Sequence, residues 1–216
     1  MTTGTRIAGF AAVCEPIAVG SDTVALWRVA DLEAHVDRTA LLAGDDAAEP
    51  PYWAHLWSGA RVLAAAVPPG AGRTVEIGCG LGLPGLAAAR RGARVTFVDR
   101  VPAALAFVRA SAAANGLAPV DTCVADFAGA ALRGPFDLVL GAEILYDRAT
   151  LGLLPATLRA CLRPGGRALL TDAGRTDTRA FYAALDRLGL PWRATAHRVR
   201  EENLPLTVRL VEVERP

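Results

Sequence analysis

The chain has 216 residues, of which 52% are hydrophobic and 21% charged, so it is long enough for one folded domain and too apolar for a disordered protein. Its 23 basic and 22 acidic residues are dispersed and give a net charge of +1, so composition carries no strong signal for a nucleic-acid or membrane partner. The four cysteines lie far apart without a C-x-x-C pair, which favours reduced thiols over disulfides or a metal site.

No apolar stretch reaches the ~20 residues needed to span a bilayer. The apolar run at residues 7–13 lacks a signal-peptide cleavage site. These features predict a soluble, cytoplasmic protein, while the oligomeric state stays open.

Residues 1–50 are predicted to form an N-terminal extension with short strands. Apolar runs at residues 7–13, 16–19 and 23–29 predict one or two strands, and a helical turn is expected around residues 31–35. The acidic, small-residue stretch 44–51 predicts a loop that leads into the main domain, residues 51–216.

The main domain shows alternating strand and helix patterns. After a helix predicted at 54–67, strands are expected at 74–77, 95–99, 122–125, 136–140 and 167–171, with helices at 84–91, 102–115, 149–162 and 178–188. Two final strand-like runs, 192–199 and 207–213, have no helix between them and predict an antiparallel hairpin. The predicted fold is α/β: a doubly wound, mostly parallel seven-stranded sheet with a terminal antiparallel hairpin and helices on both faces, as in Rossmann-like proteins.

A glycine-rich turn at residues 78–85 follows the first main-domain strand and leads into a helix. Glycines allow the backbone to turn tightly and to approach a ligand closely, so a cofactor is expected to lie across the turn. The candidate contacts in the turn are Gly78, Cys79, Gly80 and Gly82.

This turn also satisfies the dinucleotide pattern G-x-G-x-x-G, so a nicotinamide dehydrogenase is one alternative. Glu76 favours S-adenosylmethionine instead, because a carboxylate before the turn could receive an amino-acid ammonium but would repel a pyrophosphate. The extra glycine Gly78 and the terminal hairpin point the same way. For Glu76 itself, a solvated or a helix-capping carboxylate is the alternative.

Carboxylates after the next two strands complete the predicted cofactor site. Asp99 is expected to accept hydrogen bonds from ribose hydroxyls, although it could instead cap the following helix. Asp126 is expected to accept from an adenine amino group and Phe127 to pack on the base, with a core position for Phe127 equally open.

These residues resemble the seven-strand class I S-adenosylmethionine-dependent methyltransferases. Within them, the chain is similar to the lysine methyltransferase group that includes the electron transfer flavoprotein β-subunit methyltransferase. The resemblance rests on the P-Y-W-A-H-L-W segment at 51–57, the turn at 76–85, Asp99, and the G-A-E-I-L-Y-D segment at 141–147.

The resemblance implies that Trp57 and Ala142 contact the cofactor and that Glu143 and Tyr146 face the acceptor as catalytic residues. Glu143 stands where aspartate is common in the group, which lengthens the reach by one methylene. Alternatively, backbone N–H groups at the strand end could satisfy the charge of Glu143, and Tyr146 could be a simple packing residue. No metal is expected.

The function expected from these features is N-methylation of a protein lysine, with S-adenosylhomocysteine as the other product. A small-molecule amine or heterocyclic nitrogen is the second acceptor class. A dehydrogenase and a non-catalytic cofactor-binding scaffold are further alternatives.

Overall fold

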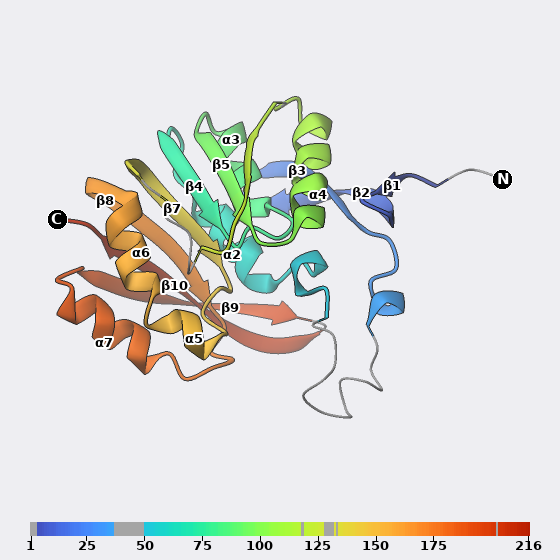
Figure 1. Ribbon diagram of the computed structural model, residues 1–216. Coiled ribbons are helices and arrows are strands. Elements are labelled where there is room, and N and C mark those ends of the chain that lie inside the picture. Colours follow the sequence, from blue (N-terminus) through green and yellow to red (C-terminus); the bar gives the residue numbers. More distant parts are fainter. Residues whose placement is uncertain (1–3, 37–49, 118, 128–131, 133, 202) are drawn as a thin grey trace.

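A seven-stranded sheet forms the centre of the computed structural model, which describes residues 4–36, 50–117, 119–127, 132, 134–201 and 203–216 (Figure 1). The strand order is β6-β5-β4-β7-β8-β10-β9. The first five strands of this order run parallel, and β10 is antiparallel to both of its neighbours, so the predicted sheet and terminal hairpin are confirmed. The strands are β4 (Arg73–Ile77), β5 (Arg94–Asp99), β6 (Asp121–Val124), β7 (Phe136–Ala142), β8 (Leu162–Asp172), β9 (Trp192–Glu201) and β10 (Leu204–Glu214).

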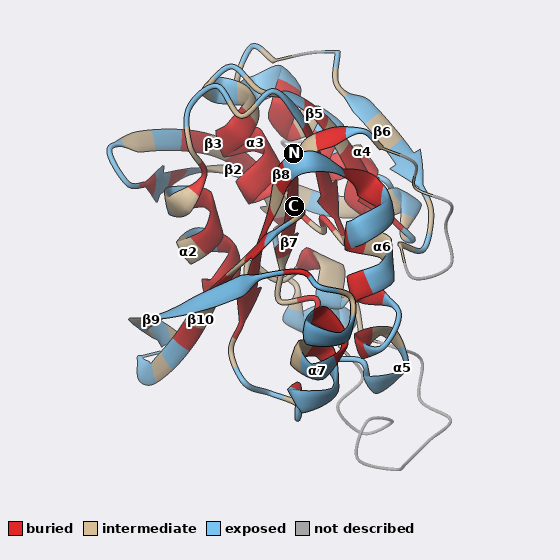
Figure 2. Cartoon of the chain, turned by 90° about the vertical axis from the view of Figure 1, so that its left-hand side faces the viewer, coloured by how far each residue is buried: buried red, intermediate tan, exposed pale blue. Residues whose placement is uncertain are grey.

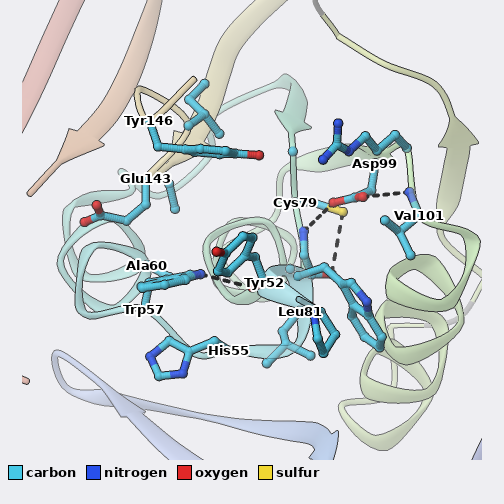
Figure 3. Close-up of a pocket in the computed structure, with 18 of the residues that line it drawn as sticks. Tyr52, His55, Trp57, Ala60, Cys79, Leu81, Asp99, Val101, Glu143 and Tyr146 are labelled. Atoms are coloured by element: carbon cyan, nitrogen blue, oxygen red, sulfur yellow. Dashed lines mark hydrogen bonds between the residues drawn. The ribbon is translucent and has the colours of Figure 1, made fainter. Parts of the chain in front are cut away.

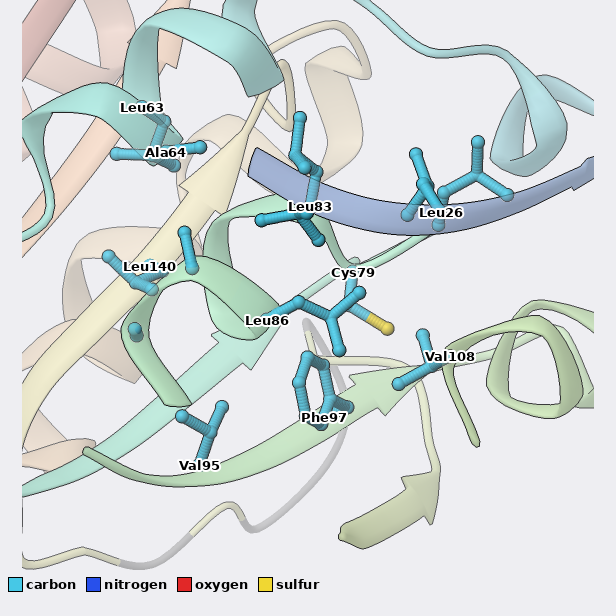
Figure 4. Close-up of a cluster of buried hydrophobic side chains, with 14 of the residues drawn as sticks. Leu26, Leu63, Ala64, Cys79, Leu83, Leu86, Val95, Phe97, Val108 and Leu140 are labelled. Carbon is cyan, nitrogen blue, oxygen red and sulfur yellow. The ribbon is translucent and has the colours of Figure 1, made fainter. Parts of the chain in front are cut away.

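Helices cover both faces of the sheet, and side-chain parity along the strands assigns each face to its helices. Phe97 and Leu140 point into the cluster formed with α2 (Ser58–Ala66), α3 (Leu83–Arg90) and α4 (Pro102–Ala114) (Figure 4). Their neighbours Val98 and Val139 point into the opposite cluster, which contains α5 (Arg148–Leu151), α6 (Leu154–Cys161) and α7 (Arg179–Arg187). The central strands of the sheet are therefore buried between two apolar layers, whereas the edge strands β6 and β9 are largely exposed (Figure 2).

A second, three-stranded antiparallel sheet lies at the N-terminus and consists of β1 (Arg6–Ile7), β2 (Phe10–Val19) and β3 (Asp22–Val29). One or two strands were expected, but β2 continues through Pro16. Proline is tolerated there because Pro16 pairs with Ala25 beyond the reach of β1, so its missing N–H would have faced a free edge. The predicted helical turn is confirmed as η1 (Glu33–His35), whereas most of the predicted loop at 44–51 lies outside the described residues.

The structure differs from the predicted helices at two places. The helix expected at 149–162 is divided into α5 (Arg148–Leu151) and α6 (Leu154–Cys161). Pro155 lacks an N–H group and suits only the first turn of a new helix, so one continuous helix cannot form. The helix expected from residue 54 begins at Ser58, after a 3-10 turn at η2 (Tyr52–Ala54). Within the described part of the chain, no helix combines the length and apolarity needed to cross a membrane.

Candidate active site

A cavity of about 470 Å³ opens at the carboxyl ends of the parallel strands (Figure 3). It lies where the sheet order reverses between β4 and β7, the usual ligand position in doubly wound folds. Five segments that are distant in the sequence meet at its wall: residues 50–57, 78–83, 99–101, 125–127 and 142–147.

The glycine turn forms the floor of the cavity, and its backbone can be made only with glycine at its centre. Gly80 has a φ of +50°, and a Cβ there would lie 2.8 Å from the Trp53 carbonyl oxygen. A Cβ at Gly78 would lie 3.0 Å from Ile144 and 3.3 Å from Phe127. Glycine is therefore needed at both positions because neighbouring protein atoms pack directly on the turn, which lines the cavity along residues 78–83.

Asp99 lies at the end of β5 and joins the turn to the next helix. Its Oδ2 accepts a hydrogen bond from the Gly80 N–H at 2.8 Å, and its Oδ1 accepts from the Val101 N–H at 2.9 Å. Burial raises the pKa of Asp99, while these two amide bonds act in the opposite direction. A carboxylate has about four lone-pair sites, and the Arg100 backbone amide is a third donor, so about one site remains for a further donor.

Glu76 does not form the cavity wall, although it was expected to meet an ammonium group there. Its side chain is fully buried, and Oε2 accepts a hydrogen bond from the Gly85 N–H at 2.8 Å at the start of α3. Burial raises the pKa of Glu76 to about 8, and Oε1 has no hydrogen-bond partner among the described groups. This geometry corresponds to the helix-capping alternative, because the side chain turns from the strand toward the helix rather than toward the cavity.

Asp126 and Phe127 reach the cavity from the chain that follows β6. Asp126 is exposed, whereas Phe127 is half-buried and packs against the second core cluster. Phe127 thus belongs both to the core and to the cavity wall. The core position expected as one alternative is present, and the ring also lines the cavity where a base was expected.

Trp57, Ala142, Glu143 and Tyr146 gather at the other end of the cavity. The Trp57 Nε1 donates to the Tyr52 carbonyl at 3.1 Å, which sets the indole ring beside the start of α2. The Tyr146 ring is 49% exposed, and Figure 3 shows it extending over the cavity above Trp57 and Tyr52. We refer to Trp57, Glu143 and Tyr146 as the acceptor end.

Glu143 has an unusual backbone and an unusual environment. Its φ of +54° is a left-handed conformation that side-chain-bearing residues adopt at a cost on the order of 1 to 2 kcal/mol. Its Oε2 accepts from the Ala173 N–H at 3.2 Å, while the buried Oε1 has no hydrogen-bond partner among the described groups. Burial raises the pKa of Glu143, which the Ala173 hydrogen bond and Arg175 oppose.

The site contains residues that the sequence did not predict. Phe10 and His35, from the N-terminal extension, line the cavity, and Phe10 packs edge-on against Trp53 at 5.5 Å. Arg175 and Glu201 lie beside Glu143 and Trp57. No local pattern marks these four residues, because each reaches the site only through the arrangement of the two sheets.

Comparisons with known proteins give a consistent set of similarities. Residues 75–166 match a family model described as a methyltransferase domain. EEF1A lysine methyltransferase 3 of Mus musculus is 35% identical over 109 residues, which cover 49% of this chain and 47% of the mouse protein. Ubiquinone biosynthesis O-methyltransferase of Xanthomonas axonopodis pv. citri (strain 306) is 32% identical over 166 residues, 71% of this chain and 66% of that protein. The chain spans about half the length of the first curated relatives that it matches.

Solved structures share the fold. The N-methyltransferase NodS of Bradyrhizobium japonicum WM9, in complex with S-adenosyl-L-homocysteine, has a TM-score of 0.58 at 18% identity and covers 86% of this chain and 97% of its own. The Thermus thermophilus 16S rRNA N2 G1207 methyltransferase RsmC, in complex with AdoMet and guanosine, has a TM-score of 0.58 at 21% identity and covers 94% of this chain and 45% of its own. At these identities the likeness concerns the fold alone.

Proposed function

We propose that this chain is a class I, S-adenosylmethionine-dependent methyltransferase and that it methylates an amine nitrogen, that of a protein lysine side chain. Its match to a methyltransferase-domain model and its fold support the first part of the proposal. The observation that carries the proposal is the acceptor end, where a buried carboxylate and two aromatic side chains line the same part of the cavity. Such a site suits a long aliphatic side chain that ends in a cation or amine.

The residues present fit the cofactor. S-adenosylmethionine, when bound, supplies a methyl group on a sulfonium and leaves as S-adenosylhomocysteine. The glycine turn lines the cavity with backbone and no bulky side chains at Gly78 and Gly80, and Asp99 at its edge keeps an acceptor site for a ribose hydroxyl. In this proposal Asp126 and Phe127, which line the cavity, meet the adenine base. Trp57, Cys79, Gly82 and Ala142 are the further contacts.

Glu76 acts in this proposal without touching the cofactor. Its Oε2 holds the Gly85 N–H and so ties β4 to the start of α3, which keeps the turn between them in shape. An ammonium group above the turn would favour the ionised form of Glu76, because an opposite charge lowers the pKa of a carboxyl group.

The acceptor nitrogen must be neutral to attack, and a free lysine amine has a pKa of about 10.4. Burial near a sulfonium lowers this pKa, and the released proton goes to solvent. Glu143 then accepts a hydrogen bond from the remaining N–H, which directs the lone pair toward the methyl carbon.

Tyr146 lies over the cavity beside Glu143 and presents a ring face and a hydroxyl. We assign it to the aliphatic and cationic part of the acceptor, since a cation within about 6 Å of an aromatic face is attracted to it. In the reaction, the nitrogen–carbon bond forms as the carbon–sulfur bond breaks. The chain's contribution is alignment and the exclusion of water.

A small-molecule acceptor is the second candidate. It is favoured by the 166-residue match to the Xanthomonas ubiquinone O-methyltransferase, which is longer than the match to the mouse lysine methyltransferase. The two candidates share the cofactor end and differ in how much of the acceptor must enter the cavity.

Incubation with methyl-labelled cofactor and host lysate tests both. Label that co-migrates with protein and is recovered as methyl-lysine after hydrolysis supports the proposal. Label found only in small molecules supports the second candidate. Absence of transfer to either fraction, with cofactor binding intact, would contradict methyltransfer to both classes.

A further inference from the structure

Arg175 contacts two residues of the acceptor end, Glu143 and Trp57, and also Glu201. Its Nη2 donates to Glu201 Oε2 at 2.6 Å, and its Nε lies 3.9 Å from Glu143 Oε2. Its guanidinium carbon lies 4.8 Å from the centre of the Trp57 ring. Arg175, in the loop after β8, thus joins three segments of the chain. These are the end of β7 at Glu143, the start of α2 at Trp57 and the C-terminal hairpin at Glu201.

Glu201 connects the same groups by a second route. It is the last residue of β9, and its Oε1 accepts from the Ser58 N–H at 3.2 Å, at the first residue of α2. The next residue, Gly59, packs so closely on Glu143 that a Cβ there would overlap the carboxylate oxygen Oε1. A closed ring of contacts therefore runs from Glu201 through α2 to Glu143 and back through Arg175.

Burial makes the charges in this ring interdependent. The side chain of Glu143 is 8% exposed, that of Glu201 21% and that of Arg175 40%. Asp172 and Glu201 add negative charge near Glu143, and Asp172 has its own partner in Arg209 at 3.3 Å. Arg175 is therefore the cation that balances Glu143, with the amide of Ala173 as the other favourable contact.

We propose that Arg175 and Glu201 are positioning residues: through the hairpin tip they hold the Glu143 carboxylate and the Trp57 ring in the arrangement that receives the acceptor. Neither residue touches the acceptor or the cofactor. The assignment of a role in turnover rests on the proposed function above, whereas the electrostatic part can be tested without any acceptor.

The first test measures the pKa of the Glu143 carboxyl group directly. Carbon-13 labelled glutamate and NMR titration report the carboxyl pKa, with the Glu143 signal identified by its loss in Glu143→Gln. Arg175→Gln removes the balancing cation, so the pKa of Glu143 should rise by about one unit, whereas Arg175→Lys should restore most of the original value. The matched control is Arg193→Gln, which breaks an exposed pair with Glu212 at 2.7 Å on the same hairpin and should leave Glu143 unchanged.

Glu201→Gln tests whether Glu201 holds Arg175 against the Trp57 ring. A glutamine can still accept from the Ser58 N–H but cannot balance Arg175, so the guanidinium should leave the Trp57 ring. The expected sign is a change in the emission that is lost in Trp57→Phe, without loss of the folded state by circular dichroism. Emission equal to that of the unchanged protein would contradict the proposal.

Once an acceptor is known, steady-state kinetics give the third readout. Arg175→Gln should lower kcat about tenfold, move the acid limb of the rate profile to higher pH together with the NMR value, and leave cofactor binding unaltered. A lower KM for the acceptor with unchanged kcat would overturn positioning, because the guanidinium would then only occupy the acceptor's place. An unshifted Glu143 pKa would also overturn it, even if methyl transfer itself were established.

Discussion

The buried carboxyl of Glu76 supports the glycine turn without lining the cavity. Its pKa is raised to about 8 because the whole side chain is buried, and the Gly85 amide offsets this only in part. The side chain therefore holds a proton more tightly in the folded chain than in the unfolded chain. Stability consequently depends on pH.

Glu76→Gln tests this dependence. The folded-state pKa is above the unfolded value of about 4.5, so the free energy of unfolding should fall as pH rises from about 4.5 to 8, by on the order of 4 to 5 kcal/mol in total. The glutamine variant cannot lose a proton there and should lack this part of the decline. Urea unfolding of both proteins between pH 5 and pH 9 measures the difference, and parallel curves would contradict the raised pKa.

Glu143 is the residue on which the proposed chemistry most depends. Glu143→Gln keeps the size of the side chain but removes its charge, so cofactor binding should persist while turnover falls more than tenfold, or about 1.4 kcal/mol of barrier. Isothermal titration with S-adenosylhomocysteine and methyl-transfer rates measure the two effects. Glu214→Gln, at an exposed position at the end of β10, is the control. Equal turnover in the two variants would remove Glu143 from the mechanism.

At the scale of elements, the N-terminal sheet is attached to the main domain by side chains of α4. Asn115, at the end of α4, accepts from the Ala25 N–H at 3.0 Å and donates to the Ala25 carbonyl at 2.7 Å. Ser111 accepts from the Trp27 N–H at 2.9 Å. These bonds satisfy the outer edge of β3, which would otherwise be open to pairing with another strand.

Asn115→Ala should therefore destabilise the fold rather than the chemistry. The Ala25 N–H and carbonyl would lose their partners, which costs about 1 to 3 kcal/mol. Chemical denaturation compared with Ala113→Ser, an exposed change on the same helix, measures this loss. If the two variants unfold at the same denaturant concentration, α4 does not hold the N-terminal sheet.

For the whole molecule, cofactor binding and folding are linked, because a ligand that binds only the folded chain raises its stability. At one hundred times the dissociation constant this gain is about 2.7 kcal/mol, so S-adenosylhomocysteine should raise the melting temperature by about 5 to 10 °C. NAD should give no such shift. A shift with NAD alone would contradict the assigned cofactor.

Gly80→Ala should abolish this thermal shift. Its φ of +50° strains a side-chain-bearing residue, and the new Cβ would press on the Trp53 carbonyl. Gly152→Ala is the matched control, because Gly152 has a φ of −77° and open space around its Cβ position. A normal shift in Gly80→Ala would show that the turn does not contact the ligand.

Local patterns in the sequence were enough to predict the order of strands and helices, the terminal hairpin and the glycine turn. These features depend on residues close together in the chain: the apolar period, Pro84 and Pro102 in first helical turns, and glycines with positive φ. Asp99 could also be predicted to lie beside the turn, because neighbouring parallel strands end at the same edge of the sheet.

Only the tertiary structure decided which way side chains turn and which distant residues meet. Glu76 faces the helix because side chains alternate across β4 and this one falls on the α3 face, where Gly85 supplies a donor. Arg175 and Glu201 meet Glu143 because β10 is inserted between β8 and β9, which brings the hairpin tip to the start of α2. Such contacts depend on sheet order and burial and join different segments, in the case of Ser58 and Glu201 143 positions apart, so no spacing within a single segment predicts them.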